Sequence, residues 1–334
     1  MNAAIKIGQI ELSSAVFLAP MTGVTDLPFR KTVHNLGAGL VISEMVASRE
    51  LVNGRADVKR RAMGDDLDPF VIQLVGCDAE LMAASAKIAQ RAGAQIIDIN
   101  MGCPSREVTG KHCGSALMRD LDHAECLIKA VVKAVSVPVT LKMRLGWDRN
   151  SLNAPELAQR AESCGIQLIT VHARTRCDFF KGEATWADIS DVKAAVTIPV
   201  IANGDITSPD TAKRALELSK ADGVMIGRGA YGAPWMPNQV STALKTGNDP
   251  GPPPHQTQRD IALNHIQNMF THYGSSLGVR IARKHVGWYL EQNKTLANEI
   301  RISWRRFLCT RTHARDMLNG LERYYEHPHE VPAQ

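Results

Sequence analysis

The sequence predicts an α/β protein in which a (β/α)₈ barrel is followed by a small all-helical C-terminal domain. Eight short apolar runs alternate with amphipathic segments up to about residue 235. The runs lack strict polar–apolar alternation, which is typical of strands buried on both faces of a parallel sheet. Eight strand–helix units in about 220 residues come close to the roughly 250 residues of a typical eightfold barrel.

The alternating runs define the expected elements in chain order. Residues 5–12 alternate around Gly8 and predict a small hairpin that closes the bottom of the barrel. Helices are expected at 80–92, 123–135, 154–164 and 209–218, the last starting at Pro209, where a missing N–H costs little. Strands are expected at 16–21, 40–45, 70–76, 96–102, 139–144, 168–174, 199–206 and 223–229.

An open doubly wound sheet is the alternative to a barrel. Such a sheet normally carries a Gly-x-Gly-x-x-Gly turn after its first strand. Here the first run is followed by TGVTD at 22–26, which favours the barrel.

Residues 247–254 read GNDPGPPP and predict a linker between the barrel domain, 1–246, and a helical domain, 255–334. Helices are expected in the second domain at 261–273, 279–292, 296–310 and 312–325. Its basic residues fit either a solvated helix surface or a face that follows a phosphate backbone. They are Arg280, Arg283, Lys284, Arg301, Arg305, Arg306, Arg311, Arg315 and Arg323.

Bulk properties indicate a cytoplasmic protein. The seven cysteines include no Cys-x-x-Cys pair, so neither a zinc ribbon nor a disulfide framework is expected, and free thiols fit a reducing compartment. The N-terminus lacks the pattern of a signal peptide, and no run approaches the roughly 20 apolar residues of a membrane span. The net charge of +5 permits a polyanionic partner without demanding one.

Polar or reactive groups stand at nearly every predicted strand end, and this is the side of the barrel where active sites lie. Burying such groups without partners costs roughly several kcal/mol each, so structural needs alone do not explain them. The pattern predicts a ligand site. Its residues are Pro20, Met21, Glu44, Gln73, Asn100, Cys103, Lys142, Arg144, His172, Arg174, Asn203, Asp205, Gly227 and Arg228.

Two glycine-containing loops, 203–205 and 227–229, follow the seventh and eighth strands, where barrels often bind phosphate. Their backbone N–H groups can approach an anion and Arg228 can clamp it, although tight turns would also explain the glycines. Both loops together favour a phosphorylated cofactor. Lys142 fits a buried ion pair, a Schiff base or a positive charge beside a flavin ring, to which Gln73 and His172 could also hydrogen-bond.

Cys103 lies just past the fourth strand in NMGCPS, on the expected active face. A thiol with an ordinary pKa near 8.5 is mostly protonated at neutral pH, so it can donate a proton as well as act as a nucleophile. Cys113 is the competing candidate. No metal site is expected, because Cys103, Cys113 and His112 lack a second ligand pair. The other cysteines are interpreted as structural: Cys77, Cys126, Cys164, Cys177 and Cys309.

Several stretches resemble the bacterial tRNA-dihydrouridine synthases, and the B-type branch in particular. DINMGCPS (98–105) together with LKMRLGW (141–147) is the most specific, and RIARKHVGWYL (280–290) looks B-type. The resemblance covers nearly the whole chain. The other matching stretches are APMTGVTDLPFR (19–30), GAGLVISEM (37–45), IQLVG (72–76), GSALM (114–118), HARTR (172–176), IPVIANGDI (198–206) and VMIGRGAYGAPW (224–235).

The resemblance implies a TIM barrel that holds FMN over its mouth, is reduced by NADPH and reduces a uridine of the tRNA D-loop, at position 17. Cys103 would protonate C5 of the uracil after hydride delivery to C6, and the helical domain would cradle the tRNA. No membrane and no obligate protein partner are implied. The FMN contacts map onto Pro20, Met21, Thr22, Gln73, Lys142, His172, Asn203, Gly204, Asp205, Gly227 and Arg228. Candidate substrate contacts are Asn100, Arg144, Arg174, Arg280, Arg283 and Lys284.

Two other functions remain in view at this point. One is a flavin barrel that acts on a small molecule of the dihydroorotate or enoate type, although such a substrate does not need the arginine-bearing helices. The other is a non-catalytic RNA-binding protein, against which the reactive cysteine and the complete phosphate loops argue.

Overall fold

The computed structural model describes residues 5–64 and 66–330, which fall into two units. The barrel unit comprises the residues up to Gly229 and Pro237–Asp249, and the helical unit comprises Ala230–Met236 and the residues from Pro250 onward. Residues 230–236 were predicted to belong to the barrel domain. This segment groups with the helices because Tyr231 stacks on Trp288 at 3.9 Å and its carbonyl accepts a hydrogen bond from Gln292 Nε2.

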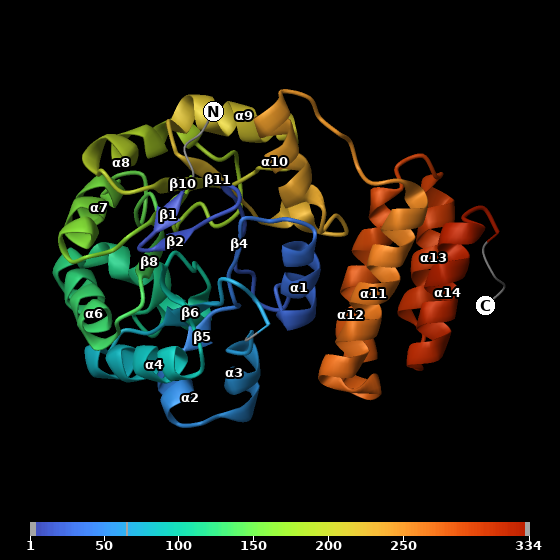
Figure 1. Ribbon diagram of the computed structural model, residues 1–334, viewed down its shortest axis with the longest axis horizontal. Helices are drawn as coiled ribbons and strands as arrows, with labels where there is room; N and C mark the ends of the chain where they lie inside the picture. The colour runs from blue at the N-terminus through green and yellow to red at the C-terminus, as the bar shows by residue number, and fades with distance from the viewer. Residues whose placement is uncertain (1–4, 65, 331–334) are drawn as a thin grey trace. The chain divides into compact units, whose positions relative to one another are not determined.

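The barrel sheet contains nine parallel strand segments in the described chain, in the order β4-β3-β11-β10-β9-β8-β7-β6-β5. Its two end segments are neighbours in sequence, and Ile42 bridges to Val71, so the sheet closes on itself (Figure 1). The strands are β3 (Val16–Leu18), β4 (Leu40–Val41), β5 (Val46–Ala47), β6 (Val71–Val75), β7 (Ile96–Met101), β8 (Val139–Arg144), β9 (Ile169–His172), β10 (Val200–Asn203) and β11 (Gly223–Ile226).

All eight predicted runs contain a strand, but the second one, predicted at 40–45, forms only β4, and a separate segment, β5, follows it. The Ser43 hydroxyl accepts a hydrogen bond from the backbone N–H of Gln73 at 2.9 Å, a role that a strand carbonyl would otherwise fill. The next residue, Glu44, turns its carboxylate to the Gly23 amide. These side-chain contacts interrupt the strand at the rim of the barrel.

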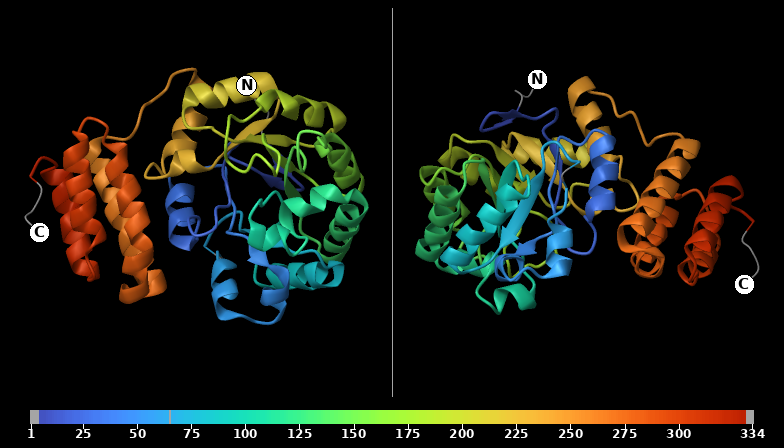
Figure 2. Two further views of the ribbon diagram at one scale, coloured as in Figure 1. Left: turned by 180° about the vertical axis from the view of Figure 1, so that it is seen from behind. Right: turned by 60° about the horizontal axis from the view of Figure 1, so that its bottom comes forward.

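Helices surround the strands of the barrel unit (Figure 2). Asp78 and Asp120 cap α4 and α6 by accepting a backbone N–H of the first turn, and Ser208 begins α9 with a capping box. The four predicted barrel helices are confirmed to within two residues at each end. The helices are α1 (Leu27–Asn35), α2 (Ser48–Val52), α3 (Ala56–Arg61), α4 (Ala79–Arg91), α5 (Arg106–Thr109), α6 (Leu121–Ala134), α7 (Ala154–Ser163), α8 (Ile189–Ala195), α9 (Pro209–Ser219) and α10 (Met236–Thr246).

The predicted hairpin, β1 (Lys6–Ile7) and β2 (Ile10–Glu11), closes the N-terminal end of the barrel. Ile5, Ile7 and Leu12 are buried in one apolar cluster with residues at the beginnings of the barrel strands, Ile96 and Leu168 among them. This floor leaves the opposite rim for the polar groups of the site.

The helical unit contains α11 (His255–Tyr273), α12 (Ser275–Gln292), α13 (Asn298–Cys309) and α14 (Ala314–Glu326), which pack side by side (Figure 1). Trp304, Tyr289 and Tyr324 lie in its core, and the Tyr289 hydroxyl is 3.0 Å from His265 Nδ1. The helices match the predicted pattern, although α11 begins six residues earlier than expected. In the described chain, none of the helices has both the length and the apolar content to span a bilayer.

Candidate active site

A buried lysine lies at the C-terminal ends of the barrel strands. Lys142 is the fourth residue of β8, and its Nζ donates a hydrogen bond to Asn203 Oδ1 on β10 at 3.1 Å. The Asn203 side chain is oriented in turn by donating to the Met225 carbonyl at 2.7 Å. Burial, with a further contribution from Arg144, lowers the pKa of Lys142 to about 8. This cation would be stabilised by an anionic or hydrogen-bond-accepting ligand.

A second polar chain begins at Asp98, inside strand β7. Asp98 Oδ1 accepts from Thr140 Oγ1 at 2.6 Å, and its Oδ2 accepts from Gln73 Nε2 at 2.7 Å. Burial raises the pKa of Asp98. Because the carboxyl group takes the amide nitrogen of Gln73, the amide oxygen of Gln73 faces the other way.

That amide oxygen positions Asn100, and Asn100 positions the loop of Cys103. Asn100 Nδ2 donates to Gln73 Oε1 at 2.7 Å, which leaves Asn100 Oδ1 to accept from the amides of Gly102 and Cys103 at 3.1 and 3.0 Å. The half-buried Cys103 is therefore held by a chain of contacts that runs from Asp98 on β7 through Gln73 on the neighbouring strand β6 and back to Asn100. Sequence reasoning found Gln73, Asn100 and Cys103 but missed Asp98, whose signal was a charged residue within an apolar run.

The electrostatics of Cys103 favour a thiol over a thiolate. Burial raises the pKa of Cys103, and the opposing effects of the Ser105 amide, Arg144 and Lys142 do not reverse this shift. The Cys103 carbonyl accepts from both the amide and the hydroxyl of Ser115, at 3.1 and 2.8 Å. Cys103 is thus a protonated group at neutral pH, suited to donate a proton.

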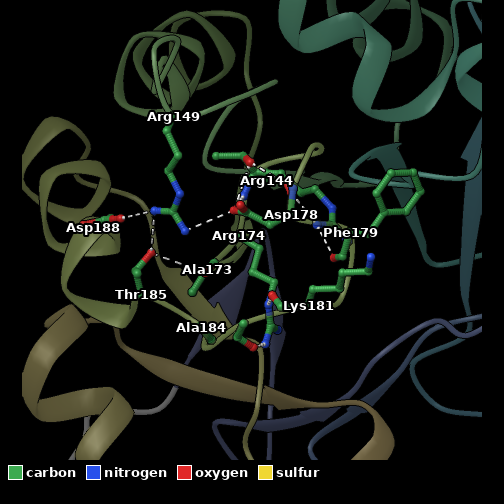
Figure 3. A network of polar contacts seen from close by, with 12 residues as sticks. Arg144, Arg149, Ala173, Arg174, Asp178, Phe179, Lys181, Ala184, Thr185 and Asp188 are labelled. Atoms are coloured by element: carbon green, nitrogen blue, oxygen red, sulfur yellow. Dashed lines mark hydrogen bonds and ion pairs between the residues drawn. The ribbon is translucent and has the colours of Figure 1, made fainter.

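Arg144 links the Cys103 loop to the loop after β9. Its side chain is buried and donates to the carbonyls of Gly102, Thr175 and Phe179 at 2.7–2.8 Å (Figure 3). Burial lowers the pKa of Arg144 to about 10. Arg144 was predicted to contact the substrate, whereas its guanidinium hydrogen-bonds to backbone carbonyls of the protein itself.

Arg174 has a similar environment. It donates to the carbonyls of Lys181 and Gly182 at 3.1 and 2.6 Å and pairs with the Asp205 carboxylate (Figure 3). Its side chain is 1% exposed. Arg144 and Arg174 together hold loop 175–184 by donating hydrogen bonds to four of its backbone carbonyls.

The two predicted phosphate loops lie at the ends of β10 and β11. Gly204 and Asp205 have positive φ angles of 118° and 52°, and Trp186 Nε1 fixes the turn by donating to the Gly204 carbonyl at 2.8 Å. Arg228 is 53% exposed and pairs with Asp205 at 3.2 Å. A Cβ placed on Gly227 would be in ordinary van der Waals contact with Met21, 3.7 Å away, so packing within the protein does not by itself require a glycine there.

An exposed aromatic ring accompanies these groups. Phe180 is 53% exposed, and its ring lies 5.3 Å from the Arg144 guanidinium and 5.6 Å from that of Arg228. His172 lies 6.1 Å away, and burial followed by the charges of Arg144 and Lys142 holds its pKa well below the usual value, so its imidazole is neutral. Sequence reasoning missed Phe180, because nothing local marks one phenylalanine of a loop as exposed.

The remaining predicted residues occupy two places. Pro20 and Met21 are half-buried after β3 and Thr22 is exposed, with the Met21 amide donating to Thr25 Oγ1 at 2.8 Å. The predicted basic contacts Arg280, Arg283 and Lys284 belong to α12 of the helical unit. Arg280 is exposed, whereas Arg283 is half-buried and donates to the Arg311 carbonyl at 3.1 Å. Within the described residues no group of His, Cys, Asp and Glu could hold a metal ion.

Comparison with known proteins identifies the family. Residues 17–325 match the family described as Dihydrouridine synthase (Dus). The chain belongs to the dihydrouridine synthase family. Its members are flavin oxidoreductases that act on tRNA, so the chain is an enzyme rather than a binding protein.

Two curated relatives and one solved structure illustrate the likeness. A probable tRNA-dihydrouridine synthase of Rickettsia conorii is 54% identical over 85% of this chain and 87% of that protein. The tRNA-dihydrouridine synthase B of Pseudomonas putida is 50% identical over 86% of each, which confirms the B-type resemblance. Histamine dehydrogenase from Rhizobium sp. 4-9 is 14% identical with a TM-score of 0.57, over 80% of this chain and half of that one, and it supports the barrel fold alone.

Proposed function

We propose that the enzyme binds FMN at the barrel rim, is reduced by NADPH and converts a uridine of the tRNA D-loop, at position 17, to 5,6-dihydrouridine. The observation that carries this proposal is the meeting of a buried cation and a protonated thiol at one rim. Lys142 and Cys103 lie on neighbouring strand ends, and both side chains are influenced by Arg144. A small-molecule flavin barrel, the other enzyme considered, is disfavoured by the family assignment.

The residues at the rim fit a phosphorylated flavin. The exposed side chain of Arg228, next to a glycine that has no side chain of its own, suits a phosphate group. Lys142 has one acceptor, Asn203 Oδ1, among the described residues, which leaves N–H donors for an electron-rich ring. Reduced FMN supplies the hydride when it is bound. The other proposed contacts of the cofactor are Pro20, Met21, Thr22, Gln73, His172, Asn203, Gly204 and Asp205.

Cys103 supplies the proton in this proposal. Its raised pKa keeps the thiol protonated, and Asn100 holds the backbone of its loop so that Sγ stays in one position. Transfer from Sγ to C5 of the uracil completes the saturation of the C5–C6 bond. Arg144 and Arg174 position the loops on either side, and the uridine must leave its stacked position to reach them.

The proposed helical domain spans 255–334. It supplies a basic surface that binds tRNA, and the enzyme acts in the cytoplasm. Five of its arginines are exposed, while a hollow between α11 and α14 carries Asp260 and Glu322 and is unsuited to phosphates. The affinity for tRNA should therefore fall steeply as salt rises. Replacing Arg280 by Ala should reduce the salt slope by about one, whereas Glu322→Gln should leave it unchanged. An affinity independent of salt would contradict this surface. The exposed arginines are Arg280, Arg305, Arg306, Arg315 and Arg323.

The decisive test compares two cysteine variants. Cys103→Ala should lower the rate of dihydrouridine formation by about 10²–10⁴-fold, the usual contribution of a general acid, while bound FMN stays at the wild-type level. Cys113→Ala, the matched control in the same loop region, should keep the wild-type rate. Dihydrouridine is measured by mass spectrometry of digested tRNA, and flavin by its absorbance after denaturation. Wild-type turnover in Cys103→Ala would remove this residue from its role.

A further inference from the structure

Two half-buried thiols outside the proposed proton-transfer step lie against each other beside the Cys103 loop. Cys77 follows β6, and Cys113 directly precedes the turn Gly114–Arg119. Both sulfurs contact one acceptor, the Lys111 carbonyl, with Cys77 Sγ at 3.1 Å and Cys113 Sγ at 3.3 Å. The shared carbonyl therefore makes the two thiols neighbours, and Cys77 contributes to raising the pKa of Cys113.

The surroundings suit redox chemistry better than metal binding. Within the residues described, no third His, Cys, Asp or Glu completes a metal site. Burial and the contact with Cys77 raise the pKa of Cys113 to about 12, while Lys111 and Arg49 act in the opposite direction. Cys113 is therefore a thiol at neutral pH, and oxidation of Cys77 would remove one of the contributions that raise its pKa.

We propose that Cys77 and Cys113 form a reversible disulfide that regulates the Cys103 loop in response to a two-electron oxidant of the peroxide class. Peroxide oxidises the Cys77 thiol to a sulfenic acid and leaves as water. Cys113 Sγ then attacks the Cys77 sulfur, an S–S bond forms, and the hydroxyl leaves as a second water. A dithiol reductant restores both thiols and is itself oxidised to a disulfide.

The contact with the Cys103 loop makes such a bond consequential. Forming it draws both sulfurs off the Lys111 carbonyl. Gly114, the next residue after Cys113, packs so closely that an added Cβ would lie 2.9 Å from the Cys103 carbonyl. Ser115 follows and donates twice to that same carbonyl. A shift at Cys113 is therefore transmitted within two residues to the backbone of Cys103.

The first experiment tests the bond itself and does not depend on the proposed function. The full-length protein is treated with hydrogen peroxide, blocked with iodoacetamide and digested with trypsin without reduction. Cys77, Cys103 and Cys113 then fall in separate peptides, 62–87, 92–106 and 112–119, each with a single cysteine. The expected product is peptide 62–87 linked to 112–119, and dithiothreitol should abolish it. Separate peptides after treatment that oxidises the exposed Cys126 would overturn the proposal.

The second experiment tests regulation and rests on the proposed function. Peroxide should lower the rate of dihydrouridine formation by about tenfold or more in the wild type, since small misplacements near reacting groups cost up to ~10²-fold. Dithiothreitol should restore it. Cys113→Ser and Cys77→Ser should resist, and Cys126→Ser should behave as the wild type. Equal inactivation of Cys113→Ser would overturn regulation by this pair, as would a linked wild type of full activity.

Two controls keep these outcomes distinct. Thermal melting establishes that the serine variants fold, and alanine variants at the same positions replace any that do not. If the untreated, reduced wild type forms no dihydrouridine, the proposed function is contradicted. The linked peptides would still show whether the Cys77–Cys113 disulfide forms.

Discussion

Replacing Arg144 by Met should destabilise the barrel unit strongly, because this side chain joins two loops of the site from a buried position. The Arg144 side chain donates three hydrogen bonds to backbone carbonyls. It is only 1% exposed, so water does not reach these bonds from the arginine side. Hydrogen bonds from a charged donor contribute about 1.5–3 kcal/mol each, so the loss of all three would cost about 4.5–9 kcal/mol.

The cost of burying the cation offsets part of that loss. Burial lowers the pKa of Arg144 to about 10, and at about 1.4 kcal/mol for each pKa unit the buried charge costs roughly 3 kcal/mol in the wild type. Methionine removes this cost and keeps the apolar stem. The free energy of unfolding of the barrel unit should therefore fall by about 1.5–6 kcal/mol.

Arg149→Met is the matched control within the same network. Arg149 pairs with Asp178 and Asp188 at 3.0 and 3.3 Å, but it is 45% exposed, and pairs of that kind contribute about 0–1 kcal/mol (Figure 3). Amide hydrogen exchange of β8 and β9 reads the stability of the barrel unit without interference from the helical unit. An equal effect of the two variants would refute the reasoning from buried carbonyls.

Two pH dependences complete the predictions. Lys142 loses its charge as the pH rises through about 8, so FMN affinity measured by fluorescence quenching should fall by up to about tenfold per pH unit above that value. Lys142→Met should abolish this dependence and the exposed Lys181→Met should keep it; a flat wild-type profile would contradict the role of Lys142. Burial lowers the pKa of His265 to about 3 and that of His285 well below its usual value, so the unfolded chain binds protons that the folded unit does not. The helical unit should lose about 1.4 kcal/mol per pH unit for each histidine as the pH falls from about 6.5 toward 3, and urea unfolding should show a shallower loss in His265→Leu but not in the exposed His313→Gln.

The regular elements of the barrel were predictable because their signals are local. The strands β6, β7 and β8 are buried along their whole length, and their continuous runs without strict alternation indicated this burial. The helix α9 began at the predicted Pro209. The clustering of strand-end groups followed from the barrel itself, which brings those ends to one rim.

The roles of the arginines were not predictable, because they depend on contacts distant in sequence. Arg144 and Arg174 were interpreted as candidates for binding substrate, yet their donors meet carbonyls of loop 175–184. A backbone carbonyl has no identity in the sequence, so no motif reveals which arginine will bind one. The interruption of the second predicted strand at Ser43 has the same origin, since it depends on the amide of Gln73 in the next strand.

The hairpin at the N-terminal end of the barrel limits how substrates can reach the site. The buried side chains of Ile5, Ile7 and Leu12 close the N-terminal end of the barrel. Under the proposed function, NADPH and the tRNA must then both reach the site from the polar end of the barrel. Two molecules of that size cannot occupy the same opening at once, so the oxidised reductant should dissociate before the tRNA binds.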